Sequence, residues 1–365
     1  MNRLNGRPVK IRDLGEFGLI ARIKNRLPTL PSSVIKGIGD DAAVSALPSG
    51  KQLLTTVDLL IEGVHFDFSF LSPYLLGRKS LSVNVSDIAA MGATPKFAFL
   101  SLAIPERMKI ETLDDFFKGF LETAAEYGIS LLGGDTSASP GVLFINVTLL
   151  GEGKKGKLVF RHGAKPGDDL YVTGTLGDSL LGLKIAQEKR KGRVSREEKY
   201  LLNRHFNPTP RVREGRTLGE KRLVHSMIDV SDGLLSDLGH ICEESRVGAR
   251  LWVERLPLSR SLRAAAGKRE SASWQMALQG GEDYELLFSA SPKNGPRIQA
   301  LGRKWKCGIT RIGRIESAES GIVIEGRSGL VDLRPFKGYD HFGSRRGKKS
   351  LSEKEKRAER VGAWK

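Results

Sequence analysis

The sequence predicts an α/β protein that has mixed sheets and two α/β domains. Short apolar runs of strand length alternate with longer segments of helical spacing along most of the 365 residues. A chain of this length is expected to form one large or two medium domains. Residues 151–168 are rich in Gly and Lys and divide the pattern into two halves. We therefore predict an N-terminal domain over residues 1–155, a C-terminal domain over 156–342, and a basic, disordered tail over 343–365.

The composition excludes several classes of protein. The net charge of +17 is concentrated near the two ends of the chain, which favours loose attraction to nucleic acid or membranes. No nucleic-acid-binding motif accompanies this charge, so no specific nucleic-acid partner is expected. No apolar run reaches ~18 residues and the first residues lack a signal peptide, so no membrane association is expected. Two distant cysteines, Cys242 and Cys307, suit a reducing cytoplasm.

In the N-terminal half, one helix is predicted with particular clarity, from Ser72 to Gly92. Ser72 suits the N-cap, Pro73 the first turn and Gly92 the residue after the helix. Its polar residues Ser80, Asn84 and Asp87 share a face, which indicates either the lining of a cavity or a hydrated surface stripe. The other elements expected in this half are helices over 14–27 and 113–127 and strands over 51–60, 97–104, 129–136 and 142–150.

The C-terminal half repeats the alternation of strands and helices. Residues 188–200 are highly charged and are expected to form an exposed loop or a helix extension. The remaining predictions are strands over 170–173, 227–230, 309–315 and 321–332, a strand that follows Gly280-Gly281-Glu282-Asp283, and helices over 179–187, after 211 and after 233.

Acidic residues recur beside glycines or strands at five places in the sequence. They are Asp40-Asp41, Asp58, Asp87, Asp135, and Asp229 with Asp232. Carboxylates are costly to cluster without cations, so this pattern favours a Mg²⁺–nucleotide site. The alternative for Asp232 is a helix-dipole partner in an ordinary capped helix. Residues 151–157 fit the first part of a P-loop, but Leu158 replaces its Ser or Thr, so we reject that motif.

At this point a set of seven motifs, in order, closely resembles the thiamine-monophosphate kinase family, part of the aminoimidazole ribonucleotide synthetase-like superfamily. The resemblance extends from about Leu14 to Phe342. The motifs are Gly-Ile-Gly-Asp-Asp-Ala-Ala-Val, Glu-Gly-Val-His-Phe, Ser-Val-Asn-Val-Ser-Asp-Ile-Ala-Ala-Met-Gly-Ala, Gly-Gly-Asp-Thr, Thr-Gly-Thr-Leu-Gly-Asp-Ser, Ile-Asp-Val-Ser-Asp-Gly-Leu and Gly-Gly-Glu-Asp-Tyr-Glu-Leu.

The resemblance implies a phosphotransferase whose acceptor is a phosphate group. ATP would phosphorylate thiamine monophosphate to thiamine diphosphate by direct in-line transfer that depends on Mg²⁺. The N-terminal domain would bind ATP and Mg²⁺, and two such domains would pair through their sheets in a cytoplasmic homodimer. Asp229 and Asp232 would be the catalytic carboxylates.

The resemblance also assigns roles to individual residues. The implied metal ligands are Asp41, Asp58, Asp87, Asp135, Asp229 and Asp232. The implied ATP-binding residues are Thr56, Gly134, Asp135, Arg161 and Ser231. The implied substrate-binding residues are His65, Glu282 and Tyr339. Val57 stands where the family often has a hydroxyl residue, which puts one metal or nucleotide contact in question.

Two other functions are compatible with these residues. One is a related ATP-dependent synthetase that acts on another phosphorylated heterocycle. The other is a nucleotide-binding scaffold without catalytic activity, tethered through its basic tail. Production of thiamine diphosphate from ATP, Mg²⁺ and thiamine monophosphate would distinguish the kinase from both.

Overall fold

The computed structural model describes residues 31–331, except 48–49, 189–193, 267–269 and 328, and a few positions before residue 31. The chain divides into two compact units, one formed by Thr29–Gly338 and the other by Met1–Pro28 with Tyr339–Lys365. The second unit includes the antiparallel strands β1 (Arg3–Leu4) and β2 (Arg7–Pro8). Most of the helix predicted over 14–27, Tyr339 and the basic tail lie outside the described residues.

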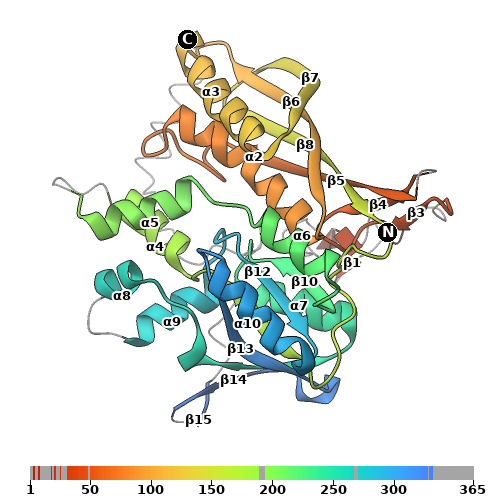
Figure 1. The fold of residues 1–365 in the computed structure, drawn as a ribbon. Helices are drawn as coiled ribbons and strands as arrows, with labels where there is room; N and C mark the ends of the chain where they lie inside the picture. Colours follow the sequence, from red (N-terminus) through yellow and green to blue (C-terminus); the bar gives the residue numbers. More distant parts are fainter. Residues whose placement is uncertain are drawn as a thin grey trace. The chain divides into compact units, whose positions relative to one another are not determined.

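The unit Thr29–Gly338 contains two large sheets with helices, which confirms the predicted α/β class (Figure 1). The N-terminal sheet has six strands, and all its neighbouring strands are antiparallel except β6 and β7. Its strands, in spatial order, are β3 (Val34–Lys36), β4 (Ala43–Ala46), β5 (Lys51–Ile61), β8 (Phe144–Lys154), β6 (Thr94–Pro105) and β7 (Ser130–Ser139).

Two helices, α2 (Pro73–Ala90) and α3 (Ile110–Tyr127), share an apolar core with this sheet (Figure 1). They approach each other closely at two glycines. A Cβ atom on Gly77 would lie 2.0 Å from the Phe116 carbonyl oxygen, and one on Gly119 would lie 1.9 Å from the Tyr74 carbonyl oxygen. Only glycine permits this separation of the two helix backbones.

The ends of α2 confirm the prediction from its sequence. Ser72 Oγ accepts a hydrogen bond of 3.3 Å from the Leu75 N–H, and Gly92 has a φ of +68°. The proposed surface stripe is wrong, because Ser80 and Asn84 are fully buried. Their side chains donate to carbonyl groups of the same helix, which satisfies these donors without water.

The C-terminal sheet has seven strands, of which only β11 and β14 pair in parallel. Its strands, in spatial order, are β10 (Ser226–Asp229), β12 (Leu286–Ala290), β9 (Asp169–Thr173), β13 (Ile309–Glu316), β11 (Gly248–Trp252), β14 (Ile322–Gly326) and β15 (Gly329–Leu330). Strand β8 ends at Lys154 and β9 begins at Asp169, so the segment between the sheets is shorter than the Gly- and Lys-rich stretch.

The helices of this half are α4 (Asp178–Gln187), α5 (Arg196–Phe206), α6 (Val212–Glu220), α7 (Leu234–Ser245), α8 (Arg260–Ala266), α9 (Glu270–Gln279) and α10 (Gly295–Lys304). Short 3₁₀ turns occupy Val253–Arg255, Pro292–Asn294 and Ala318–Ser320. Part of the charged stretch 188–200 begins α5, where Ser195 and Glu198 form a capping box. Strand β11 and helices α8, α9 and α10 were not predicted.

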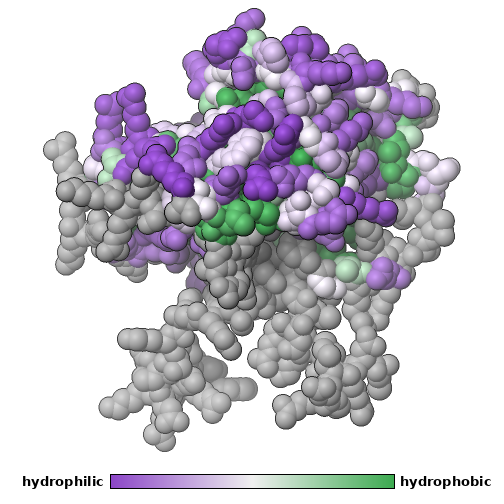
Figure 2. Space-filling view, turned by 90° about the horizontal axis from the view of Figure 1, so that it is seen from below, coloured by the Kyte–Doolittle hydropathy of each residue, from purple (hydrophilic) through white to green (hydrophobic). Residues whose placement is uncertain are grey.

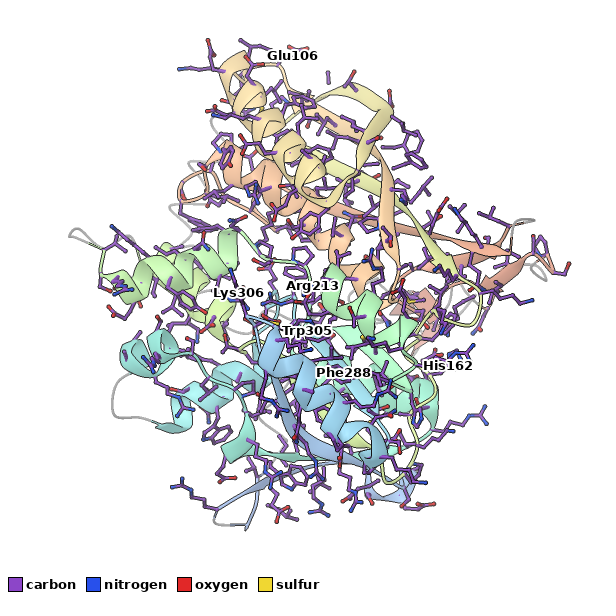
Figure 3. All side chains as sticks on the ribbon, in the orientation of Figure 1. Glu106, His162, Arg213, Phe288, Trp305 and Lys306 are labelled. Carbon is purple, nitrogen blue, oxygen red and sulfur yellow. The ribbon has the colours of Figure 1, made fainter. Side chains whose placement is uncertain are left out.

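Two apolar clusters pack against the C-terminal sheet. One includes Ile228 of β10, Leu238 of α7 and Leu278 of α9. The other includes Phe288 of β12 and Trp305, which follows α10 (Figure 3). Buried side chains on successive residues of β10, Met227 and Ile228, belong to different clusters, so both faces of this strand are covered.

None of the helices in the described ranges is long and apolar enough to cross a membrane. Among the described residues, the face in Figure 2 is largely hydrophilic, with hydrophobic residues in smaller patches.

Candidate active site

Carboxylates from both halves of the compact unit converge at one place. One oxygen each from Asp41, Asp87 and Asp229 lies within 4.8 Å of the other two. Asp41 precedes β4, Asp87 lies on α2, and Asp229 ends β10. Residues 188 positions apart in the sequence, Asp41 and Asp229, are therefore neighbours. The tertiary structure creates a compact group of acidic oxygens from three separate motifs.

Two further predicted acids, Asp58 and Asp232, are electrostatically coupled to this group. Burial and the charge of Asp232 raise the pKa of Asp58 to about 6. Burial, followed by the charges of Asp58, Asp229 and Asp41, raises the pKa of Asp87 well above its usual range. Burial and Asp41 raise the pKa of Asp229 to about 8. The folded chain disfavours so many negative charges together, so a cation here would be strongly favoured.

The donor set fits a divalent cation that prefers oxygen. Asp41 Oδ2 and Asp229 Oδ1 are buried and have no hydrogen-bond partner among the described residues. The other oxygen of each acid is held in place, because Arg161 Nη2 donates to Asp41 Oδ1 over 2.7 Å and Ser86 Oγ donates to Asp229 Oδ2 over 2.5 Å. Buried carboxylate oxygens without partners are costly unless a cation satisfies them. Mg²⁺ takes such ligands.

Thr56 and Asp58 lie on the side of β5 that faces α2. Alternate residues of β5 are buried, and the Thr56 hydroxyl donates a hydrogen bond to Asp87 Oδ2. Val57 points to the opposite side, where 56% of its surface is exposed. A hydroxyl at position 57 would therefore point away from the carboxylates of its own chain.

Arg161, in the segment between the two sheets, lies against the carboxylate cluster. Both Nε and Nη2 donate to Asp41 Oδ1, over 3.2 and 2.7 Å. Its backbone N–H donates to Asp40 over 3.3 Å. Burial and the charge of Asp41 raise the pKa of Asp40 to about 7. Asp40 holds the Arg161 segment, and the guanidinium is a permanent positive charge at a position where a phosphate group would benefit from it.

The Asp237 side chain fixes the turn between β10 and α7 by hydrogen bonds, and we did not predict it as a site residue. Asp237, buried in the first turn of α7, accepts hydrogen bonds from the backbone N–H groups of Ser231, over 3.1 Å, and Gly233, over 3.0 Å. Asp237 therefore satisfies donors at the start of the helix, which is the role that the helix-cap alternative gave to Asp232. Its position one turn after Gly233 was a signal in the sequence.

Gly134 and Asp135 lie apart from the group of three carboxylates. Strand β7 is at the edge of the N-terminal sheet, and the Asp135 side chain is exposed there. Asp135 Oδ1 accepts a hydrogen bond of 2.9 Å from the Thr136 N–H. A Cβ atom on Gly134 would lie 1.7 Å from the Leu100 carbonyl oxygen, so the glycine permits close pairing of β7 with β6. Their proposed roles in binding ATP or metal stay predictions.

A second group of charged residues surrounds Glu282. Lys79 Nζ of α2 lies 2.9 Å from Glu282 Oε1, and His205 Nδ1 of α5 lies 3.2 Å from Oε2. Burial opposes ionisation of Glu282, but Lys79, then His205 and His65, lower the pKa of its carboxyl group. His65 is therefore close to Glu282, and the substrate-binding roles of the two residues stay predictions. The charge that Glu282 could offer to a cation is already balanced by Lys79.

We did not predict Lys79 or His205 as site residues. Lys79 precedes Asp87 by eight residues of α2, which places it about 80° around the helix from Asp87, so the spacing gave only a weak signal. His205 carried none that separates it from an ordinary buried histidine.

The segment that carries Glu282 has an unusual backbone. Glu282 and Tyr284 have φ values of +61° and +51°, which cost free energy in residues other than glycine. Their N–H groups donate to the carbonyl oxygens of Ser231, over 2.7 Å, and Val230, over 2.9 Å. The segment is thus joined by backbone hydrogen bonds to Val230 and Ser231, the two residues between Asp229 and Asp232.

Both halves of the chain match the domains of one known protein family. Residues 39–152 match the AIR synthase related protein, N-terminal domain, and residues 165–325 match the AIR synthase related protein, C-terminal domain. The two matches include most residues of both sheets and the carboxylates Asp41, Asp87 and Asp229. The chain is therefore an AIR synthase related protein.

Individual relatives match this chain over nearly its whole length. The chain is 38% identical to the thiamine-monophosphate kinase of Escherichia coli strain K12, over 90% of this chain and 98% of that protein. It is 38% identical to that of Aquifex aeolicus strain VF5, over 92% and 100%. The solved structure of AaThiL complexed with AMPPCP and TMP superimposes with a TM-score of 0.79 and 35% identity, over 92% of this chain and 99% of that one. The chain belongs to the thiamine-monophosphate kinase family.

Proposed function

We propose that this chain transfers the γ-phosphoryl group of ATP directly to thiamine monophosphate, in a Mg²⁺-dependent reaction that yields thiamine diphosphate. The convergence of carboxylates from both halves of the unit, next to the Glu282 group, carries this proposal. The family supports it, as does a similar protein, AaThiL, whose solved complex contains AMPPCP and TMP. A metal–phosphate site and an acceptor site side by side are what in-line transfer requires.

Charge neutralisation is the main contribution of the carboxylate cluster. Asp41, Asp87 and Asp229, assisted by Asp58 and Asp232, would hold Mg²⁺, which supplies positive charge to the phosphate oxygens. Asp229 and Asp232 are the proposed catalytic carboxylates. The acceptor phosphate is already ionised at neutral pH, so the site needs no strong general base and no covalent intermediate.

Several residues would position the two substrates. The Arg161 guanidinium would exchange part of its contact with Asp41 for a phosphate group of ATP. Ser231 would contribute its hydroxyl and Thr56 would orient Asp87. On the acceptor side, Glu282 and His65 would bind the heterocycle. Tyr339, which lies outside the described residues, would stack on it.

We further propose that the N-terminal sheets of two copies pair in a homodimer, with ATP near the interface. The face of the sheet away from α2 exposes apolar side chains, and such a patch favours a protein partner. These residues are Val57, Leu59, Phe97, Phe99 and Leu132. Strand β7 borders the same sheet, so a second copy would lie beside Gly134 and Asp135. This arrangement would let them take part in binding ATP although they lie apart from the cluster.

The domain division at residues 155 and 156 and a cytoplasmic location complete the proposal. The division falls in the segment between β8 and β9. Both cysteines, Cys242 and Cys307, are unpaired, as is usual in a reducing compartment.

The test is direct. Full-length protein is mixed with ATP, MgCl₂ and thiamine monophosphate, and thiamine diphosphate is measured by chromatography. Formation of thiamine diphosphate supports the kinase. Phosphorylation or condensation of a different phosphorylated heterocycle would indicate the related synthetase, and ATP binding without turnover would indicate a scaffold. Asp232→Asn should abolish turnover while leaving the fold intact, and near-wild-type turnover in this variant would contradict the metal assignment.

A further inference from the structure

Glu282 is held between two buried basic side chains that approach it from different helices. Only 1% of the Lys79 side chain is exposed, whereas 32% of the Glu282 side chain is exposed. Lys79 Nζ contacts one carboxylate oxygen and His205 Nδ1 faces the other. An ammonium group is costly to bury, so a fully buried lysine with its charge directed at one partly exposed carboxylate needs an explanation.

The protonation states follow from chemistry and contacts. An ionised carboxylate can only accept hydrogen bonds, so a ring nitrogen that faces it must carry the proton. Burial and the nearby Lys79 lower the pKa of His205 to about 3, which makes the ring neutral. His205 therefore carries its single proton on Nδ1, which is hydrogen-bonded to Ser179 Oγ at 2.9 Å and lies 3.2 Å from Glu282 Oε2. Lys79 is the cation of the group, and His205 is a neutral ring that lies against the other carboxylate oxygen.

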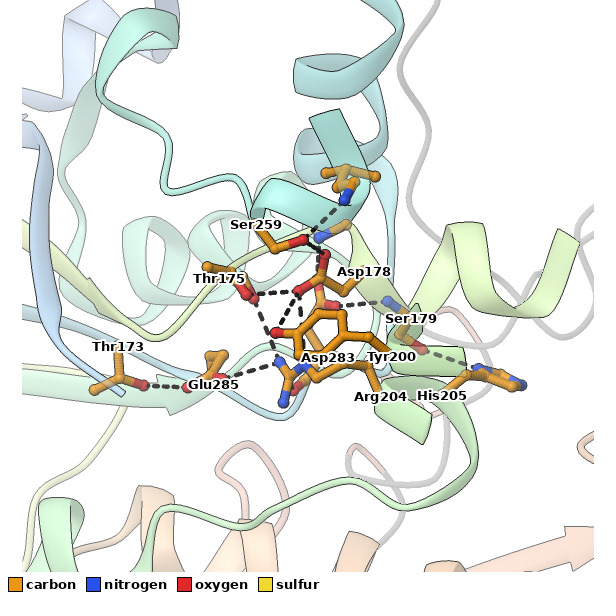
Figure 4. A network of polar contacts seen from close by, with 12 residues as sticks. Thr173, Thr175, Asp178, Ser179, Tyr200, Arg204, His205, Ser259, Asp283 and Glu285 are labelled. Atoms are coloured by element: carbon orange, nitrogen blue, oxygen red, sulfur yellow. Dashed lines mark hydrogen bonds and ion pairs between the residues drawn. The ribbon is translucent and has the colours of Figure 1, made fainter. Parts of the chain in front are cut away.

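Backbone and side-chain hydrogen bonds fix the positions of Glu282 and His205 relative to each other. Asp283, next to Glu282, accepts hydrogen bonds from the N–H groups of Gly177, over 2.6 Å, and Ser179, over 3.1 Å (Figure 4). Ser179 in turn contacts His205, which contacts Glu282, so the contacts form a closed loop. The same loop keeps Glu282 in its left-handed conformation, because Asp283 cannot move without breaking the start of α4.

The next acid in the segment, Glu285, serves a different purpose. It is fully buried and pairs with Arg204 over 2.9 Å (Figure 4). It also pairs with Arg211, over 2.5 and 2.6 Å. Thr173 Oγ1 donates to it over 2.7 Å. Glu285 is thus surrounded by side chains of this protein, whereas part of the Glu282 side chain is exposed to solvent. The contrast singles out Glu282 as the acid of this segment that is available to a ligand.

We propose that Lys79 and His205 are positioning residues of the acceptor site, which hold the Glu282 carboxylate in one orientation so that it accepts a hydrogen bond from an N–H group of the acceptor heterocycle. This inference rests on the proposed kinase function. A carboxylate has about four lone-pair sites, and Lys79 and His205 each lie against one of its oxygens, at 2.9 and 3.2 Å. The remaining sites can accept from the acceptor, whose aminopyrimidine ring carries an exocyclic amino group. Since Lys79 balances the charge, recognition depends on the direction of a hydrogen bond and not on attraction of a cation.

Lys79→Met and His205→Phe test the positioning role by steady-state kinetics on the full chain. Each should raise the KM for thiamine monophosphate by about ten-fold or more, as expected for the loss of a hydrogen bond to a charged group. The KM for ATP should stay within about two-fold, because neither residue contacts the carboxylate cluster. His205→Asn retains an N–H donor near the position of Nδ1 and should recover most of the affinity for thiamine monophosphate.

A double variant separates positioning from simple stability. Lys79→Met leaves the partly exposed Glu282 carboxylate without its cation and should lower the Tm, whereas Lys79→Met with Glu282→Gln removes both charges and should recover it. The KM for thiamine monophosphate should stay high in the double variant. Arg78→Met is the matched control, since Arg78 is adjacent on α2 but pairs with Glu126 over 2.8 Å. This control should leave both KM values unchanged.

The nature of the ligand contact is tested with the monophosphate of a thiamine analogue in which oxygen replaces the pyrimidine amino group. The wild-type protein should discriminate against this analogue by about ten-fold or more, and Glu282→Gln, which can donate as well as accept, should discriminate less. Equal use of both acceptors by the wild-type protein would overturn the hydrogen-bond assignment.

Three results would overturn the positioning role. They are an unchanged KM for thiamine monophosphate in Lys79→Met or His205→Phe, an equal rise in the KM for ATP, and a return of the KM to the wild-type value in the double variant. If Lys79→Met does not fold, His205→Phe and His205→Asn decide the question. Failure of the proposed function is recognised separately, because the wild-type protein itself would then form no thiamine diphosphate.

Discussion

Replacement of Asp229 by Asn should have opposite effects on stability and on activity. The Asp229 oxygen lies within 4.8 Å of oxygens of Asp41 and Asp87. Two full charges at this distance repel by about 3 kcal/mol at an effective dielectric constant of about 20. Arg161 offsets part of this repulsion, so neutralising position 229 should stabilise the metal-free protein by about 2 kcal/mol above about pH 8, where Asp229 is ionised, and by less at lower pH. The Asn side chain can still accept the hydrogen bond from Ser86.

The pH dependence of stability gives a second, independent test of the Asp229 prediction. The pKa of Asp229 is raised to about 8, from an ordinary value near 3.8, by burial and by Asp41. Between these two pH values the folded state holds more protons than the unfolded state. The contribution of Asp229 to stability is therefore greatest below about pH 4 and is lost as the pH rises through about 8. In Asp229→Asn this part of the decline should disappear.

Mg²⁺ should act only on the wild-type protein. A ligand present at about 100 times its Kd stabilises the folded state by about 2.7 kcal/mol. Urea denaturation in EDTA and in MgCl₂, from pH 5 to 9, measures all three effects, and formation of thiamine diphosphate reports activity. A less stable metal-free Asp229→Asn protein would refute the repulsion argument. Equal stabilisation of both proteins by Mg²⁺ would refute the metal assignment.

Three more predictions concern residues that the structure distinguishes sharply. Glu285→Gln leaves the buried Arg204 and the partly buried Arg211 without their full counter-charge and should lower the free energy of unfolding by about 3 kcal/mol in urea. Gly281→Ala places a Cβ atom 2.4 Å from the Ser231 carbonyl oxygen, so it should lower both the Tm and the turnover, whereas Gly239→Ala, with nothing within 4 Å, should not. Val57→Thr should leave kcat and both KM values within about two-fold, since the side chain points away from the cluster of its own chain.

Each of these has a clear contrary outcome. A loss of less than about 1 kcal/mol in Glu285→Gln would mean that the buried ion pairs contribute little to stability. Unaltered activity in Gly281→Ala would show that the turn at Ser231 tolerates displacement. A large gain in activity from Val57→Thr would mean that position 57 does contact the nucleotide or metal.

The sequence by itself determined the class of fold and most elements of both sheets. A helix was predicted correctly where the sequence carries signals for both of its ends. In α2, for example, Ser72 and Pro73 mark the start and Gly92 marks the end. Local signals failed for α8, α9 and α10, whose apolar spacing is interrupted or short. The order of the motifs also identified the family, because glycines and acids at fixed spacings depend on local geometry that the sequence records directly.

Only the tertiary structure decided which acids meet. Asp41, Asp87 and Asp229 form one group, whereas Asp135, with an equally suggestive Gly-Gly-Asp motif, stays on an exposed edge strand. Lys79 and His205 were found in the same way, since the contact of each with Glu282 joins segments far apart in the chain. Which face a strand presents and which helix covers it depend on packing between distant segments, and that packing leaves no local mark in the sequence.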